Sequence, residues 1–148
     1  MILKLIGAIT FCFGGFLLGR SIEKQYAEKT IFWKEVLSFL TYCQSEIRHN
    51  GKTMDEICSD LRKQKGKYSV MIADAVQYNT IEEELRFLND FSTEIATVDS
   101  LTQTKVFSRY EEDVKKKIEE AEKNHRKNGK NFQKIIPILC IGVAVLLW

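Results

Sequence analysis

Two uncharged stretches decide the fold of this 148-residue chain: LIGAITFCFGGFLLG at residues 5–19 and IIPILCIGVAVLLW at residues 135–148. Residues 20–134, which lie between them, hold nearly all of the charge. A chain that is apolar only near its two ends is typical of two membrane anchors on either side of one polar domain. We therefore expect a transmembrane helix at 1–20, a cytoplasmic helical bundle at 21–130 and a second transmembrane helix at 131–148.

Both apolar stretches are short for a membrane span. As helices, 15 and 14 residues rise about 22 and 21 Å, whereas the hydrocarbon core of a bilayer is about 30 Å thick. Lys4 and Lys134 can direct their ammonium groups toward the headgroups, which adds the neighbouring apolar residues to each span. We expect both stretches to cross the membrane as tilted helices or in a thinned bilayer.

The first stretch also has the length and the preceding lysine of a secretory signal. No Ala-x-Ala-like cleavage site follows it, because Gly19 leads directly into Arg20. We expect an uncleaved anchor. The alternative is an exported helical binding domain whose amino-terminal signal is removed.

Basic residues near the two stretches predict the orientation of the chain. Those that follow the first stretch or precede the second are Arg20, Lys24, Lys29, Lys123, Arg126, Lys127, Lys130 and Lys134. Because lysine and arginine next to membrane spans stay on the cytoplasmic side, we expect the central domain to be cytoplasmic. The net charge is only +2, and these flanks account for the basic excess, so we expect no nucleic-acid partner.

The central domain has the pattern of an all-α bundle of about five helices. Between residues 20 and 134 there is no proline, and the only glycines are Gly51, Gly66 and Gly129. We expect the first helix to run from the membrane to Asn50 and to end at Gly51. The second helix is expected to begin at a capping box of Thr53 and Glu56.

Three further helices are expected: one near residues 67–77, one that begins at a capping box over 80–83, and one that runs from a capping box over 100–103 toward Asn128. On the last helix, acidic residues precede basic residues by four positions, as in Glu112 with Lys116 and Asp113 with Lys117. The side chains expected to face the core are Trp33, Val36, Leu37, Leu40, Cys43, Ile47, Met54, Ile57, Cys58, Leu61, Tyr68, Met71, Ile72, Ala75, Ile81, Leu85, Leu88, Phe91, Ile95, Phe107, Tyr110, Val114, Ile118 and Ala121.

No residue pattern in the chain is typical of a catalytic or metal site. There is no Cys-x-x-Cys motif, and His49 and His125 are far apart in the sequence. Cys43 and Cys58 fall at apolar helical positions, as buried thiols do. We expect a protein that is not an enzyme and has no catalytic residue, no metal and no cofactor.

Gly15 and Gly19 form a small-xxx-small pattern, which is typical of closely packed membrane helices. The partner helix is either the second apolar stretch of the same chain or a second copy in a homo-oligomer. We favour packing within the chain.

Four motifs occur in a distinctive order: LKLIGA at 3–8, Leu40 to Ile47 near the end of the first helix, Leu88-x-x-Phe91, and Asp99-x-x-x-Gln103 before the last helix. In this order and spacing the chain resembles the stage III sporulation protein AB family over nearly its whole length. The resemblance implies a structural membrane scaffold of the mother-cell to forespore channel complex of endospore-forming bacteria. Its central domain would be similar to the F domain of type II secretion platform proteins.

The resemblance also implies partners and a place in the cell. The protein would lie in the mother-cell membrane around the forespore, dock the stage III sporulation AA ATPase to the membrane assembly, and contact other membrane subunits of the channel. Asp99 and Gln103 would then either bind a partner or cap the amino end of the last helix, and we favour capping.

Overall fold

The computed structural model describes residues 2–64, 66–78 and 83–146, and their regular structure is all helical, which confirms the all-α class. The chain divides into two compact units. Unit 1 combines residues 1–31 with 118–148, and unit 2 consists of residues 32–117. Both boundaries lie further from the chain ends than the domain limits at 20 and 130 that the sequence predicts.

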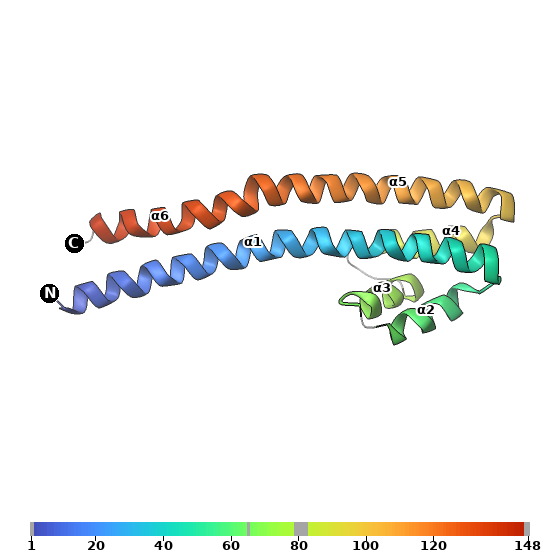
Figure 1. The fold of residues 1–148 in the computed structure, drawn as a ribbon, viewed down its shortest axis with the longest axis horizontal. Helices are drawn as coiled ribbons and strands as arrows, with labels where there is room; N and C mark the ends of the chain where they lie inside the picture. The colour runs from blue at the N-terminus through green and yellow to red at the C-terminus, as the bar shows by residue number, and fades with distance from the viewer. Residues whose placement is uncertain (1, 65, 79–82, 147–148) are drawn as a thin grey trace. The chain divides into compact units, whose positions relative to one another are not determined.

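Six α-helices and two π-helical turns make up the described structure (Figure 1). The α-helices are α1 (Ile2–Ser45), α2 (Met54–Lys63), α3 (Ser69–Gln77), α4 (Glu83–Thr97), α5 (Ser100–Asn124) and α6 (Lys130–Leu146). One π-helical turn, Glu46–Asn50, follows α1, and the other, His125–Gly129, joins α5 to α6.

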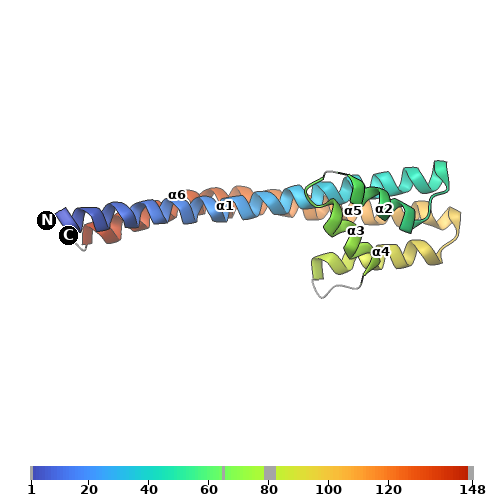
Figure 2. The same cartoon turned by 90° about the horizontal axis from the view of Figure 1, so that it is seen from below.

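In unit 1 the first part of α1 lies beside α6, and the two helices run in opposite directions (Figures 1 and 2). Close backbone approaches occur at two levels. A Cβ atom at Gly15 would lie 2.3 Å from Cys140 Sγ, and one at Gly129 would lie 3.4 Å from Tyr26 Cβ. A side chain at position 15 would require Cys140 of the facing helix to move, so glycine allows the two helices to lie close together here.

The predicted transmembrane helices at 1–20 and 131–148 are not confirmed. Within the parts of the chain that the structure describes, no helix has both the length and the apolar content needed to cross a membrane. The helix α6, for example, has 17 residues, and its first turns contain Lys130 and Lys134.

Local signals in unit 2 act largely as the sequence predicts. Gly51 has a φ of 62° and ends the first helical segment in the left-handed conformation. The capping box is present: Glu56 N donates to Thr53 Oγ1, and Thr53 N donates to Glu56 Oε2 at 2.9 Å. The capping box predicted over 80–83 lies outside the described residues.

The core of unit 2 is built around aromatic rings from α1, α4 and α5. Phe91 of α4 is fully buried, and its ring centroid lies 6.5 Å from Phe39, 5.3 Å from Phe107 and 5.1 Å from Tyr110. These edge-on contacts add to the free energy gained by burial. The helix α3 packs against both α2 and α4, and Figure 2 shows it between them.

Most of the predicted core is confirmed, but one predicted residue is exposed, and five buried apolar residues were not predicted: Phe32, Phe39, Ala73, Val76 and Val106. Met71 was expected in the core but is 38 % exposed, whereas its neighbours Ile72 and Ala73 are buried. Phe32 and Phe39 are buried although the predicted stripe of α1 does not include them. Ile81, which the sequence places in the core, lies outside the described residues.

We expect Phe91→Ala to lower the free energy of unfolding by about 3–5 kcal/mol, because it would leave a cavity where three helices meet. Urea denaturation followed by circular dichroism measures the change. Met71→Ala is the control and should change stability by less than about 0.5 kcal/mol, since Met71 is partly exposed. Equal losses in the two variants would contradict this description of the core.

Candidate partner-binding site

The corner between α4 and α5 brings together the two residues that the sequence singles out, Asp99 and Gln103. The Asp99 carbonyl accepts a hydrogen bond from Gln103 N at 2.9 Å, which is the first helical bond of α5. The N-cap is therefore Asp99 and not Ser100, the N-cap of the capping box predicted over 100–103. The Gln103 side-chain amide donates to the Ile95 carbonyl at 3.3 Å. Gln103 therefore ties the start of α5 to the last turns of α4, while Asp99 is exposed.

Further along the same two helices, Glu94 joins α4 to α5. Glu94 pairs with Arg109 and accepts a hydrogen bond from the Tyr110 hydroxyl at 3.0 Å. Burial, together with the neighbouring Glu94 carboxylate, raises the pKa of Tyr110. Sequence spacing does not reveal this cluster, because Glu94 lies on α4 whereas Arg109 and Tyr110 lie on α5.

A groove of about 590 Å³ lies along the other side of α4. Its lining residues are Met54 and Asp55 of α2, Val76, Gln77 and Tyr78 at the end of α3, and Asn89, Ser92, Thr93, Ala96 and Thr97 of α4. The α4 side is formed by short side chains, and Tyr78 is 65 % exposed. The groove reaches Thr97, two residues before Asp99, so the corner lies at one end of the groove.

Polar contacts fix the helix ends that form the mouth of this groove. Gln77 Nε2 donates to Asp55 Oδ1 at 3.0 Å, and Gln77 Oε1 accepts from Arg62. Arg62 also pairs with Asp74 at 2.8 Å, which raises the pKa of the guanidinium. Side-chain contacts therefore hold the end of α3 against α2, in addition to the loop that connects the two helices.

The glycines predicted to pack membrane helices belong to unit 1, whereas the residues that line the groove belong to unit 2. Gly15 and Gly19 are both buried. Gly15 faces Cys140 and Ile136 of α6, the second apolar stretch of the same chain. Gly15 thus packs against a helix of its own chain, which is the arrangement that we favour over contact with a second copy.

Comparison with known families gives a match over residues 4–79, just over half of the chain, to the family model of stage III sporulation protein AB. The chain belongs to the stage III sporulation protein AB family. This is a structural sporulation family and not a known enzyme family, and it gives the chain a role in stage III of sporulation. No curated protein and no solved structure gave a significant match.

The region that matches the stage III sporulation protein AB family contains α1, α2 and α3. It therefore includes Gly15, Gly19 and the Tyr78 end of the groove. Asp99 and Gln103 lie beyond it, so their assignment rests on the geometry of the corner.

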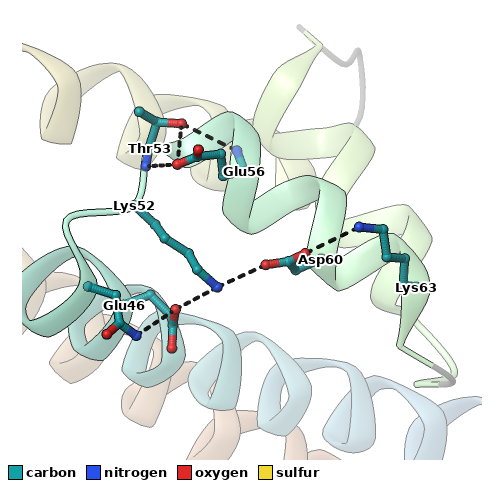
Figure 3. A network of polar contacts seen from close by, with 7 residues as sticks. Glu46, Lys52, Thr53, Glu56, Asp60 and Lys63 are labelled. Carbon is teal, nitrogen blue, oxygen red and sulfur yellow. Dashed lines mark hydrogen bonds and ion pairs between the residues drawn. The ribbon is translucent and has the colours of Figure 1, made fainter.

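A second polar cluster in the family region joins the turn after α1 to α2 (Figure 3). Lys52 Nζ lies 2.8 Å from Glu46 Oε2 and 3.0 Å from Asp60 Oδ2, so one ammonium group bridges two carboxylates. Hydrogen bonds from Lys52 lower the pKa of both Glu46 and Asp60 and raise the pKa of Lys52 itself. The cluster fixes the corner that begins at Gly51.

The described residues contain no group of three or more His, Cys, Asp or Glu side chains that could bind a metal ion. Cys43 and Cys58 are buried free thiols. Burial raises the pKa of Cys58 to about 11 and that of Cys43 well above its ordinary value, so both remain protonated at neutral pH. These properties are those of small apolar core residues.

The structure gives Lys117 a role that charge spacing does not predict. Its ammonium lies 4.8 Å from the ring centroid of the buried Trp33 and 5.7 Å from that of Phe87. A cation over two aromatic rings stabilises the contact of α5 with α1 and α4. The predicted pair of Glu112 with Lys116 is present at 3.2 Å.

We expect Lys52→Gln to reduce the loss of stability that accompanies acidification. The lowered pKa values of Glu46 and Asp60 mean that their stabilising contribution is complete above their ordinary pKa of about 4. That contribution disappears as the pH falls through the lowered values. Thermal unfolding at pH 7 and pH 3 should therefore show a smaller drop in Tm for the variant than for the unaltered chain.

Lys63→Gln is the matched control for this measurement. Lys63 also lies 3.4 Å from Asp60, but its side chain is 74 % exposed and it contributes less to the lowered pKa of Asp60. The control should keep most of the pH dependence of the unaltered chain. The same drop in Tm for Lys52→Gln and the unaltered chain would contradict the bridging role.

Two substitutions at Asp99 distinguish the contribution of its side chain as an N-cap from the contribution of its negative charge to stability. Asp99→Ala should lower the free energy of unfolding by about 1 kcal/mol, because alanine is a poor N-cap. Asp99→Asn should change it by only a few tenths of a kcal/mol, since asparagine caps as well as aspartate. Urea denaturation measures both changes, and an alanine variant as stable as the unaltered chain would rule out capping.

Proposed function

We propose that this protein is a structural scaffold of the sporulation channel complex, and that it attaches to the mother-cell membrane around the forespore through unit 1. Unit 2 would lie in the cytoplasm and dock the stage III sporulation AA ATPase. Membership of the stage III sporulation protein AB family supports the sporulation role. Attachment to the mother-cell membrane and docking of the ATPase are the parts that we propose.

The observation that carries the membrane proposal is the number of large apolar side chains that unit 1 exposes. Their exposed fractions run from 42 to 66 %, and they are Ile9, Phe13, Phe16, Leu17 and Leu18 of α1 with Ile135, Ile138, Leu139, Ile141 and Val143 of α6. Clusters of exposed large apolar side chains mark surfaces that bind a membrane or another protein. Acyl chains of a lipid bilayer would cover it, and other membrane subunits of the channel could bind there in the same environment.

The contact of Gly15 with Cys140 supports an anchor that is retained. Removal of residues up to Gly19 as a signal would take away the part of α1 that faces α6 at this level. More of the apolar surface of α6 would then be exposed to solvent. Packing within unit 1 thus favours the scaffold over an exported domain with a cleaved signal.

The groove along α4 supports the proposal that unit 2 docks a protein. Short side chains of α4 allow the backbone of a partner helix to come close, and the exposed Tyr78 supplies an aromatic anchor of the kind enriched in interfaces. We propose that the ATPase binds this groove.

Tyr78→Ala should weaken binding of the ATPase about thirtyfold, the loss typical of an aromatic anchor worth about 2 kcal/mol. The full chain, purified in a neutral detergent, is immobilised and titrated with the stage III sporulation AA ATPase. Val70→Ala is the control, because Val70 is also exposed, at 54 %, but does not line the groove. If the two variants bind equally well, the groove is not the docking site, and if the unaltered chain does not bind, the ATPase proposal fails.

A further inference from the structure

Unit 1 carries basic side chains from two helices at one level. The contacts of Gly15 with Cys140 and of Tyr26 with Gly129 align residues 15–26 of α1 with residues 129–140. Arg20 and Lys24 lie within the first range and Lys130 and Lys134 within the second, and all four are exposed. We call these four residues the basic collar.

Acidic residues do little to neutralise the basic collar. The two aligned ranges contain one carboxylate, Glu23, which lies 3.7 Å from His125 Nε2. The ammonium of Lys24 is 4.0 Å from Glu28, at the limit of an ion pair, and the Lys24 side chain remains 77 % exposed. From residue 123 to the end of the chain there is no further acidic residue, while Lys123, Arg126 and Lys127 add positive charge.

Exposed apolar side chains adjoin the basic collar on both helices. On α1, Leu17 and Leu18 come just before Arg20 and are 51 and 62 % exposed. On α6, Ile135 and Ile138 follow Lys134 and are 48 and 66 % exposed. The change from apolar to basic therefore occurs at the same level on the two antiparallel helices, as it does between acyl chains and headgroups in a bilayer.

We propose that the basic collar binds anionic phospholipid headgroups and gives unit 1 a preference for anionic membranes. Phosphate groups accept hydrogen bonds from lysine and arginine, and a negative bilayer surface attracts each cation within about a Debye length. Nucleic acid offers the same phosphates but would leave the adjoining leucine and isoleucine side chains in water, so the apolar neighbours favour lipid. This inference rests on the proposed membrane attachment.

Flotation of the full chain with vesicles tests the proposal. The protein is diluted from a neutral detergent into vesicles of phosphatidylcholine alone or of phosphatidylcholine mixed with phosphatidylglycerol. Binding should be stronger on the anionic vesicles, and high salt should remove this advantage because it screens charges beyond about 3 Å at 1 M. Lys130→Gln with Lys134→Gln should reduce binding to the anionic vesicles about twenty-fivefold, at about fivefold for each charge.

Lys105→Gln with Lys115→Gln is the matched control, because it removes two exposed charges from α5 within unit 2. It should leave the preference for anionic vesicles unchanged. Equal binding of the unaltered chain to both vesicle types would overturn the inference and leave membrane attachment intact, whereas binding to neither would overturn both. An anionic preference that survives Lys130→Gln with Lys134→Gln, or that is lost equally in the control, would show that the basic collar is not the lipid site.

Discussion

The packing of Phe91 is the interaction on which unit 2 depends. This one side chain of α4 contacts Phe39 of α1 and both Phe107 and Tyr110 of α5, so it joins three helices that are distant in sequence. Because residues on a helix repeat every 3.6 positions, burial of Leu88, Phe91 and Ile95 turns a different side of α4 toward the groove. The core thereby determines which short side chains a partner would meet.

Polar side chains in unit 2 serve mainly to hold helix ends in place. Lys52 fixes the turn before α2, Gln77 holds the end of α3, and Gln103 holds the start of α5. Each of these contacts joins elements that the core alone would leave free to slide along one another. These polar groups therefore serve to position helices in a chain that belongs to a structural sporulation family.

How far the sequence predicts this structure depends on whether a signal is local. The capping box at Thr53 and the stop at Gly51 involve residues three or four positions apart, so spacing alone reveals them. Met71 was misplaced because α3 has only nine residues and is apolar on several sides, which leaves its buried side ambiguous. Phe32 and Phe39 were missed because α1 is covered on more than one side within unit 2.

The candidate site was predictable only in part for the same reason. The motif around Asp99 and Gln103 marks a helix start, but the bond from Gln103 to Ile95 depends on how the preceding helix ends. The small-xxx-small pattern predicts a close approach at Gly15, whereas the identity of the facing residue, Cys140, comes from the antiparallel pairing. The groove draws residues from three helices, which no spacing rule brings together.

The π-helical turn His125–Gly129 sets the rotational phase of α6. A π-helical turn holds one more residue than an α-helical turn, so it acts as a single-residue insertion within an otherwise continuous helix. Each residue of an α-helix advances the chain by about 100° around the axis. If residues 125–129 instead continued as an α-helix, Lys130, Lys134 and the apolar side of α6 would be rotated by about that angle relative to the preceding helix.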